Sequence, residues 1–349
     1  MMLSFVNESK IKGRVYYPTR KSYIYNGIDK DFIDNSVCLK RIDRLLYFHR
    51  NKKLVKDIEG LYALDEYALL LAYSLFSNGY VAYSLYIKYK IPYCVIVQNT
   101  DVNFYFKRIP FLRFIGRQII KHAKRVIFIS KPYKNNVIEN FLKESRKETS
   151  KKSMVIPFGI EDFWFKNKYK PKQLKINSLN LLFVGKVNAN KNITTIIDVC
   201  KELIKRNINV TYTVVGAIED HRFKKVIYDN NFINYIPFTN KEELLKIYRS
   251  NDIFIMTSLK ESFGLVYGEA MTQGLPVIYT QEQGFDQHFK EGEIGYSVDP
   301  MNVEEIVHKV ELISKRYNEI SMNCLKLVDK FKWENISKKY KSVIENLVK

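Results

Sequence analysis

The sequence has 349 residues, of which 46% are hydrophobic and 27% are charged. This profile excludes a disordered or fibrous chain, and the length is too great for one simple core, so we expect two globular domains. The formal net charge is +20 at pH 7, and residues 1–165 carry 29 basic against 15 acidic side chains. Such a basic half predicts an anionic partner, either a phospholipid, a pyrophosphate-linked acceptor or nucleic acid.

Targeting signals and cysteines indicate where the protein works. The Met-Met-Leu start is not followed by a basic region and an apolar core, and no apolar run reaches the ~20 residues that a membrane span needs. The four cysteines, at positions 38, 94, 200 and 324, lack the spacing of metal ligands. We therefore expect a cytoplasmic protein with reduced thiols and no bound metal.

The first half of the chain alternates strand and helix patterns irregularly. We predict strands at 60–63, 93–97, 126–130 and 154–157, and helices at 66–78, 80–89, 111–124 and 132–141. A polar, charged stretch at 143–152 precedes the last of these strands. Residues 160–178 lack periodicity and contain a proline, so we place a linker between two domains there.

The second half alternates more regularly. We predict strands at 179–185, 210–216, 232–237, 253–257 and 276–279, and helices at 193–206, 241–250, 267–273 and 303–328. A break near Trp333 precedes a final helix. Alternating strands and helices imply βαβ units and parallel sheets, so the expected fold class is α/β, with domains at 1–165 and 166–330 and a last helix at 331–349. The default ligand site is the cleft between the carboxyl ends of the two sheets.

The most informative segment contains two carboxylates, Glu261 and Glu269, on either side of a loop that holds Gly264. The loop enters a helix, so we expect the backbone amides of Phe263, Gly264 and Leu265 to point at an anion that the helix dipole also favours. Glu269, about one turn into the helix, can accept two hydrogen bonds from a ribose diol. Glu261, before the loop, can accept hydrogen bonds from sugar hydroxyls.

A second segment carries Lys186 and Lys191 in the loop after the strand predicted at 179–185. Two cations at the carboxyl end of a strand suit a diphosphate, and they can offset the charge that develops on a diphosphate leaving group. The alternative interpretation is a pair of solvated loop lysines.

These segments resemble the retaining glycosyltransferases of family 4, which have the GT-B architecture. The family pattern Glu-x7-Glu followed by Ala-Met-x-x-Gly-x-Pro-Val is matched by Glu261, Glu269, Ala270, Met271, Gly274, Pro276 and Val277. The family also has a basic pair after the first strand of its second domain, and Lys186 takes the place of its arginine while Lys191 takes that of its lysine. The resemblance covers residues 155–349 almost completely and 70–155 moderately.

The resemblance implies two Rossmann-like domains, an acceptor domain at 1–165 and a donor domain at 166–330, with the helix at 331–349 crossing back to the first. It implies transfer of a sugar from a UDP- or GDP-linked donor, with retained configuration and without a metal, to a glycan or lipid-linked acceptor in cell-surface polysaccharide synthesis. In the family the first Glu contacts the donor sugar, the second the ribose, and the basic pair the diphosphate. Carried over, the donor-binding residues are Gly185, Lys186, Lys191, Gly216, Glu261, Ser262, Phe263, Gly264, Leu265 and Glu269.

The first half departs from the family pattern. The loop Gln98-Asn99-Thr100-Asp101 lacks the histidine that many members carry, although Asp101 matches an aspartate often found there. The catalytic candidates are therefore Glu261, Lys191, Lys186 and Asp101. The alternative interpretation of Asp101 is a helix cap or a turn residue.

A basic segment, residues 107–134, holds nine Lys or Arg side chains and no acid, with Phe, Leu and Ile at helical spacing. A basic amphipathic helix can lie on anionic lipid, so we expect peripheral association with the inner face of the membrane. The alternative is a solvated basic face that covers a core stripe.

Two further functions remain open. A GT-B nucleotide-sugar epimerase has a similar architecture, but the arrangement of Lys191, Glu261 and Glu269 resembles family 4. The charge also allows a non-enzymatic, basic nucleic-acid-binding α/β protein. Because the sequence contains no RNP-like, helix-turn-helix or zinc motif, we do not expect nucleic acid as a partner.

Overall fold

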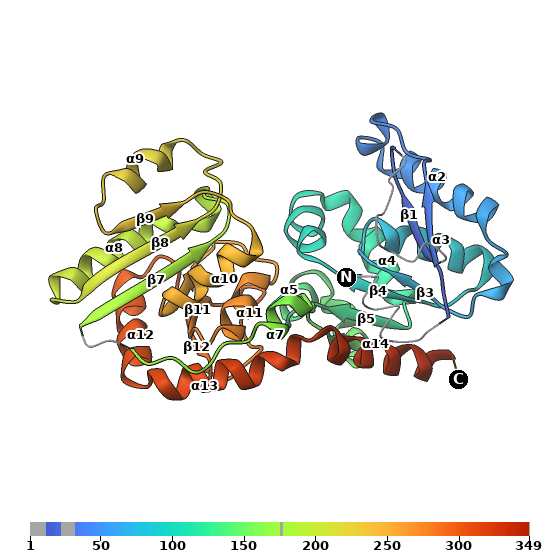
Figure 1. The fold of residues 1–349 in the computed structure, drawn as a ribbon. Coiled ribbons are helices and arrows are strands. Elements are labelled where there is room, and N and C mark those ends of the chain that lie inside the picture. The colour runs from blue at the N-terminus through green and yellow to red at the C-terminus, as the bar shows by residue number, and fades with distance from the viewer. Residues whose placement is uncertain (1–11, 22–31, 175–176, 349) are drawn as a thin grey trace. The chain divides into compact units, whose positions relative to one another are not determined.

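The structure is a computed structural model that describes residues 12–21, 32–174 and 177–348. The chain forms two compact units, and Figure 1 shows their elements. The first unit contains the described residues up to Ile129 together with Tyr133–Pro157 and Trp333–Lys349, and the second contains Ser130–Pro132 and Phe158–Lys332. The last helix therefore belongs to the first unit, although it follows the second unit in the chain.

The first unit contains two parallel sheets. The larger has the order β3-β4-β5-β6, from strands Leu70–Ala72, Tyr93–Val97, Arg125–Phe128 and Ser153–Val155. The smaller pairs β1 (Val15–Pro18) in parallel with β2 (Ile33–Ser36). Every residue of β4 is buried, which explains why this strand reads as a continuous apolar run.

The helices of the first unit connect these strands. The α-helices are α2 (Tyr47–Leu61), α3 (Asn78–Tyr89), α4 (Arg113–His122), α5 (Lys131–Phe141), α6 (Arg146–Lys152) and α14 (Trp333–Val348). Short 3₁₀ turns are η2 (Ile42–Arg44), η3 (Leu64–Glu66), η5 (Pro110–Leu112) and η6 (Lys143–Ser145), and a π-helical segment, η4, covers Asp101–Phe106.

The second unit is built on one six-stranded parallel sheet, drawn as a twisted sheet in Figure 1. The order is β12-β11-β10-β7-β8-β9, from strands Gly295–Val298, Val277–Thr280, Ile253–Met256, Ser178–Val184, Asn209–Val215 and Ile233–Ile236. The chain builds outward from β7 in one direction through β8 and β9, and then from β10 in the other. The direction of winding thus reverses between β7 and β10, which is the topological switch point of the sheet.

The connecting segments of the second unit are mostly helical. They are α7 (Asp162–Lys166), η7 (Ala189–Lys191), α8 (Ile193–Lys205), α9 (Arg222–Tyr228), α10 (Lys241–Ser250), α11 (Leu265–Thr272), α12 (Val303–Lys315), α13 (Tyr317–Leu327) and η8 (Val328–Phe331). Helix α8 buries seven side chains, among them Ile193, Ile196 and Leu203, whose spacing of three and seven is that of one helix face. This unit has one continuous hydrophobic core.

The structure confirms the α/β class with parallel sheets, and it corrects two elements predicted for the first half. The strand predicted at 60–63 is wrong, because Gly60 lies inside α2, whose buried residues Asn51, Leu54 and Ile58 follow helical spacing. The helix predicted at 66–78 is also wrong. Its Leu- and Ala-rich run favours a helix, but Leu70–Ala72 pairs with β4 as the edge strand β3.

Candidate active site in the second unit

The loops after β7 and β10 leave the sheet at its switch point, so the segments that carry Lys191 and Glu261 emerge from neighbouring strands. Lys191 Nζ lies 2.7 Å from Glu261 Oε2, and these side chains are only 20% and 14% exposed. The other carboxylate oxygen of Glu261 accepts a hydrogen bond from the Ser262 amide at 3.0 Å. Two residues seventy positions apart therefore form one charged centre at the place where open α/β sheets bind ligands.

Asn190 fixes the two loops to each other, a role that the sequence analysis missed. Its side-chain amide donates to the Lys260 carbonyl at 2.9 Å, and its side-chain oxygen accepts from the Lys260 amide at 3.1 Å. Its own carbonyl accepts a hydrogen bond from the Leu259 amide at 2.8 Å. The signal available in the sequence was an asparagine between the two lysines, since asparagine both donates and accepts hydrogen bonds to backbone in loops.

Gly264 and Gly284 allow the loop after β10 to enter α11. Gly264 has φ +73°, and a Cβ there would meet the Tyr267 ring at 2.5 Å. A Cβ on Gly284 would meet the Ser262 carbonyl oxygen at 1.8 Å, so that segment packs directly on the loop. Phe263 is buried against Phe331 and anchors the loop. The Tyr267 amide donates to the Gly264 carbonyl at 3.0 Å. The amides before it stand at the helix N-terminus, where the helix itself offers no acceptor, so they can point at an anion.

Glu269 lies in α11 and is partly buried. The Tyr248 hydroxyl donates a hydrogen bond to its Oε2 at 3.2 Å, and among the described residues Glu269 forms no ion pair. Burial raises the pKa of Glu269 to about 7, against a smaller opposing effect of the Tyr248 hydrogen bond. Such a carboxylate gains from ligand hydroxyls that donate hydrogen bonds to it, because they stabilise its charged form.

Lys186 occupies a different environment from Lys191. Its Nζ lies 2.6 Å from Glu219 Oε1, and the two side chains are 71% and 43% exposed. Glu219 also accepts from the Asn188 side chain at 2.9 Å. The structure thus brings Lys191 into the charged centre with Glu261, whereas Lys186 is held at the surface by a carboxylate that the sequence analysis did not consider.

Gly185 and Gly216, which directly follow β7 and β8, explain how the loops after these two strands come into contact. A Cβ on Gly216 would lie 2.1 Å from the Gly185 carbonyl oxygen, so the two backbones touch. The Val187 amide donates to the Ala217 carbonyl at 2.8 Å, which continues the strand pairing into both loops. A side chain at position 216 would push the loop that carries Lys186 away from its neighbour.

Asp101 lies in the first unit and has the geometry of a structural carboxylate. It is 2% exposed, and its oxygens accept from the amides of Leu75 at 3.0 Å, Phe76 at 3.1 Å and Gln98 at 2.9 Å. Burial raises its pKa to about 6, and the three amides oppose that effect. A catalytic base needs an oxygen that substrate can reach. This geometry therefore favours a positioning role over the catalytic role expected from the sequence.

The basic segment, residues 107–134, forms η5, α4, β5 and the start of α5. Phe111 and Phe114 are 71% and 65% exposed, while Ile119 and Ile120 are buried. Lys107 and Arg117 are exposed with these phenylalanines. None of the helices in the described part of the chain has the length and apolar content that crossing a bilayer requires.

Metal-ligating groups do not gather in the described residues: no three His, Cys, Asp or Glu side chains come together there in a way that could hold an ion. Cys38, Cys94, Cys200 and Cys324 are free thiols.

Comparison with known proteins agrees with this fold. Solved structures with the GT-B fold of glycosyltransferases match nearly the whole chain. The lipopolysaccharide outer core galactosyltransferase WaaB, in its apo form, has a TM-score of 0.74 at 16% identity, covering 98% of this chain and 92% of that one. Anabaena Alr3699/HepE in complex with UDP has a TM-score of 0.67 at 15% identity, covering 90% and 86%. The chain has the GT-B class of fold.

The sequence comparisons identify the domain in the second unit. Residues 165–324 match the family model described as Glycosyl transferases group 1, so this part of the chain is a group 1 glycosyltransferase domain. An uncharacterized glycosyltransferase of Methanocaldococcus jannaschii, MJ1069, is 31% identical over 252 residues, which are 67% of this chain. The chain spans 61% of that relative's length.

Proposed function

We propose that this protein is a retaining glycosyltransferase that transfers a sugar from a nucleotide diphosphate donor, UDP- or GDP-linked, to a glycan or lipid-linked acceptor. The observation that carries the proposal is the Lys191–Glu261 pair at the switch point of the second sheet, beside the first amides of α11. It lies within the group 1 domain. The second unit is the donor domain, and the first unit is the acceptor domain.

The donor-site chemistry follows from the groups present. Lys191 and the first amides of α11 offset the charge of the diphosphate as it leaves, which is electrostatic stabilisation without a metal. Glu269 accepts hydrogen bonds from the ribose hydroxyls, and Glu261 from the donor sugar. Lys186 adds a positive charge beside the diphosphate when its ammonium group leaves Glu219 and binds a phosphate oxygen instead. Support for UDP comes from the structural neighbour HepE, whose structure contains it.

The test is a pair of substitutions with different expected consequences. Glu269→Ala weakens nucleotide binding. Glu261→Ala mainly reduces sugar transfer and does not weaken nucleotide binding, because its proposed ligand contact is the donor sugar and its removal frees Lys191 for the diphosphate. Glu319→Ala, at an exposed position of α13 where the side chain pairs with Arg316, is the matched control and leaves both unchanged. Binding is measured by calorimetry with UDP and GDP, and transfer by product analysis. If both active-site variants transfer at the wild-type rate, the site assignment is wrong.

Product analysis also separates transfer from epimerisation. A transferase forms a glycoside only when an acceptor is present, and the proton couplings of that glycoside show retained configuration. An epimerase instead converts the donor without an acceptor. Appearance of an epimeric nucleotide sugar in the acceptor-free reaction would replace the proposed activity.

We also propose that the protein works at the inner face of the cell membrane, where a lipid-linked acceptor resides. Phe111 and Phe114 are exposed on a segment whose charges are all positive, which combines an apolar insertion with attraction to anionic headgroups. The check is co-sedimentation with liposomes of increasing anionic lipid content. Phe111→Ser/Phe114→Ser abolishes the lipid-bound fraction, and binding that ignores anionic lipid would remove the proposal.

A further inference from the structure

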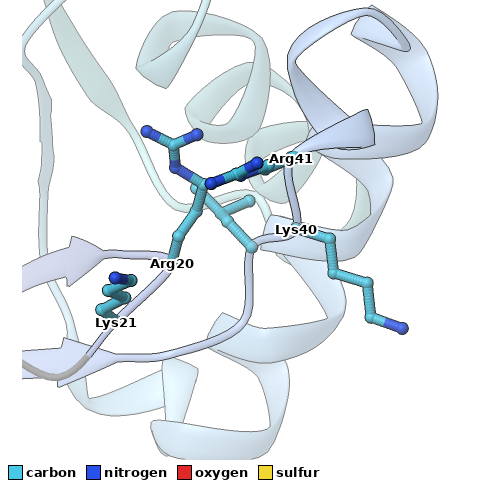
Figure 2. A pocket seen from close by; sticks show the side chains of 5 residues that line it. Arg20, Lys21, Lys40 and Arg41 are labelled. Carbon is cyan, nitrogen blue, oxygen red and sulfur yellow. The ribbon is translucent and has the colours of Figure 1, made fainter.

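A basic pocket lies in the first unit, far along the chain from the donor-site motifs. It is a cavity of about 560 Å³ lined by Arg20, Lys21, Leu39, Lys40 and Arg41. Its volume falls in the range of roughly 300–1,000 Å³ that small-molecule sites occupy. In Figure 2 the side chains of Arg20 and Arg41 extend toward the same region, while Lys40 points away from them. The two arginines are therefore the central groups of the basic pocket.

The basic pocket sits where the parallel strands β1 and β2 end. Arg20 and Lys21 follow β1, and Leu39 to Arg41 follow β2. The carboxyl edge of parallel strands is the place where α/β sheets bind ligands. The same relation holds for Lys191 and Glu261 in the second unit, so each unit carries charged groups at the carboxyl ends of its strands.

Hydrogen bonds between the two loops hold the pocket open in a defined shape. The Thr19 amide donates to the Ser36 carbonyl at 2.7 Å, and the Leu39 amide donates to the Thr19 carbonyl at 3.0 Å. The buried Thr19 hydroxyl also donates to the Asn35 side-chain oxygen at 2.8 Å. The cationic side chains thus extend from a backbone that is already organised, which reduces the entropy lost on binding.

The charges of the basic pocket lack counter-charges among the described residues. No acid lines the cavity, and neither arginine forms an ion pair with a described carboxylate. The nearest acid along the chain, Asp43, accepts from the Lys40 amide at 2.6 Å and lies 3.2 Å from Lys53 Nζ. In the second unit, by contrast, Arg206 pairs with three glutamates.

We propose that the basic pocket binds the diphosphate group of the acceptor. Arginine matches two phosphate oxygens at once through its planar fork, and two arginines that extend toward the same region match the several negative charges of a diphosphate. Leu39 supplies one apolar contact for the group beyond the phosphates. That the ligand is the acceptor rests on the proposed function, whereas the anion site itself does not.

The test measures binding of geranyl diphosphate and of inorganic diphosphate to the full chain, with UDP at saturation so that the donor site is filled. Geraniol, which lacks the phosphates, is the uncharged probe. The variant is Arg20→Gln/Arg41→Gln. The control is Lys147→Gln/Lys151→Gln, which removes the same charge from exposed positions on α6 of the same unit.

The expected result is that the arginine variant weakens geranyl diphosphate binding about tenfold or more, while the control variant and the wild type agree within twofold. Geraniol binds to none of them. Equal affinity for inorganic and geranyl diphosphate identifies the phosphates as the whole determinant, and tighter geranyl diphosphate binding adds a contribution from the lipid. Both results support the site and distinguish a phosphorylated sugar acceptor from a lipid-linked one.

Two results would overturn the proposal: unchanged geranyl diphosphate affinity in the arginine variant, or binding of a random 20-nucleotide RNA by the wild type with no diphosphate binding. UDP and GDP binding to the wild type, measured alone, is the independent readout of the donor site. If the wild type binds geranyl diphosphate but neither UDP nor GDP, the proposed function is refuted and the anion site is retained.

Discussion

The two candidate sites arrange their positive charges in opposite ways. In the second unit Lys186 and Lys191 each meet a carboxylate, at 2.6 and 2.7 Å. In the first unit Arg20 and Arg41 line a cavity that no described acid shares. A ligand at the second unit exchanges one partner for another, whereas an anion in the first unit's cavity meets arginines that have no ion pair among the described residues. Anion binding by the first unit should therefore weaken more steeply with salt than donor binding by the second.

The largest expected effect is a loss of stability in the first unit that leaves nucleotide binding by the second unit unchanged. Asp101→Ala leaves the buried amides of Leu75, Phe76 and Gln98 without their acceptor. We expect the first unit to lose about 3 kcal/mol or more, since each buried amide left unsatisfied costs roughly 1–3 kcal/mol. Urea denaturation followed by fluorescence measures this loss.

Asp101→Asn is the control for that variant, because its side-chain oxygen still accepts hydrogen bonds, and it should retain part of the stability. UDP binding at low temperature should be unchanged in both variants. A nucleotide affinity that falls with the stability of the first unit would show that the two units do not act independently.

The next effect separates the two lysines of the second unit. Lys191→Ala should reduce the transfer rate about 100-fold, which is the usual loss when one preorganised charged group is removed from a developing anion. The measurement is kcat with a saturating nucleotide sugar. Lys201→Ala, at an exposed position of α8 where the side chain meets only Asp198, is the matched control. A loss of less than threefold in Lys191→Ala would contradict the proposed role.

A smaller effect is the pH dependence of donor binding through Glu269, whose pKa is about 7 in the free protein. Ribose hydroxyls that donate to this group favour its ionised form, so binding below that pKa must release a proton. The affinity for a nucleotide sugar should therefore rise about tenfold from pH 6 to pH 8 and then level off. Calorimetry across this range checks the prediction. Glu269→Gln should remove the dependence, and a persisting slope would assign it to another group.

The smallest effect is expected at Lys186. This side chain is 71% exposed and paired with Glu219, and exposed ion pairs contribute little. Lys186→Ala should therefore raise the KM for the donor by about two- to fivefold and leave kcat unchanged. Glu219→Gln should lower that KM, because it frees the lysine for a phosphate. A hundredfold loss in Lys186→Ala would make the two lysines equivalent.

Most elements of the second unit were predictable because the strands β7 to β11 carry a local signal. Strands β7 and β8 are apolar runs that end in Gly185 and Gly216, and the backbones of those glycines touch. The helix predicted at 241–250 matches α10, which begins after the cap that Asn240 provides. Strand β12 was missed because its sequence, Gly-Tyr-Ser-Val, is not an apolar run. Helix α9 was missed because seven residues are too few for a clear helical period.

Parts of the first unit could not be predicted, because they depend on contacts distant in the sequence. Strand β3 has three residues and becomes a strand only by pairing with β4. Asp101 reads as a loop residue, and nothing local indicates that the amides of the distant Leu75 and Phe76 also donate to it. In the candidate site, the sequence motif indicated Glu261 and Lys191. The hydrogen bonds of Asn190 could not be predicted, because they join two loops whose relative position only the structure gives.

Helix α14 has a consequence for how the chain folds during synthesis. It belongs to the first unit, but a ribosome makes it only after the whole of the second unit. The second unit can reach its native state while the chain is still being extended, since domains generally fold as units in the order of synthesis. The first unit completes its packing last, because the surface that α14 covers stays open until that helix has been made.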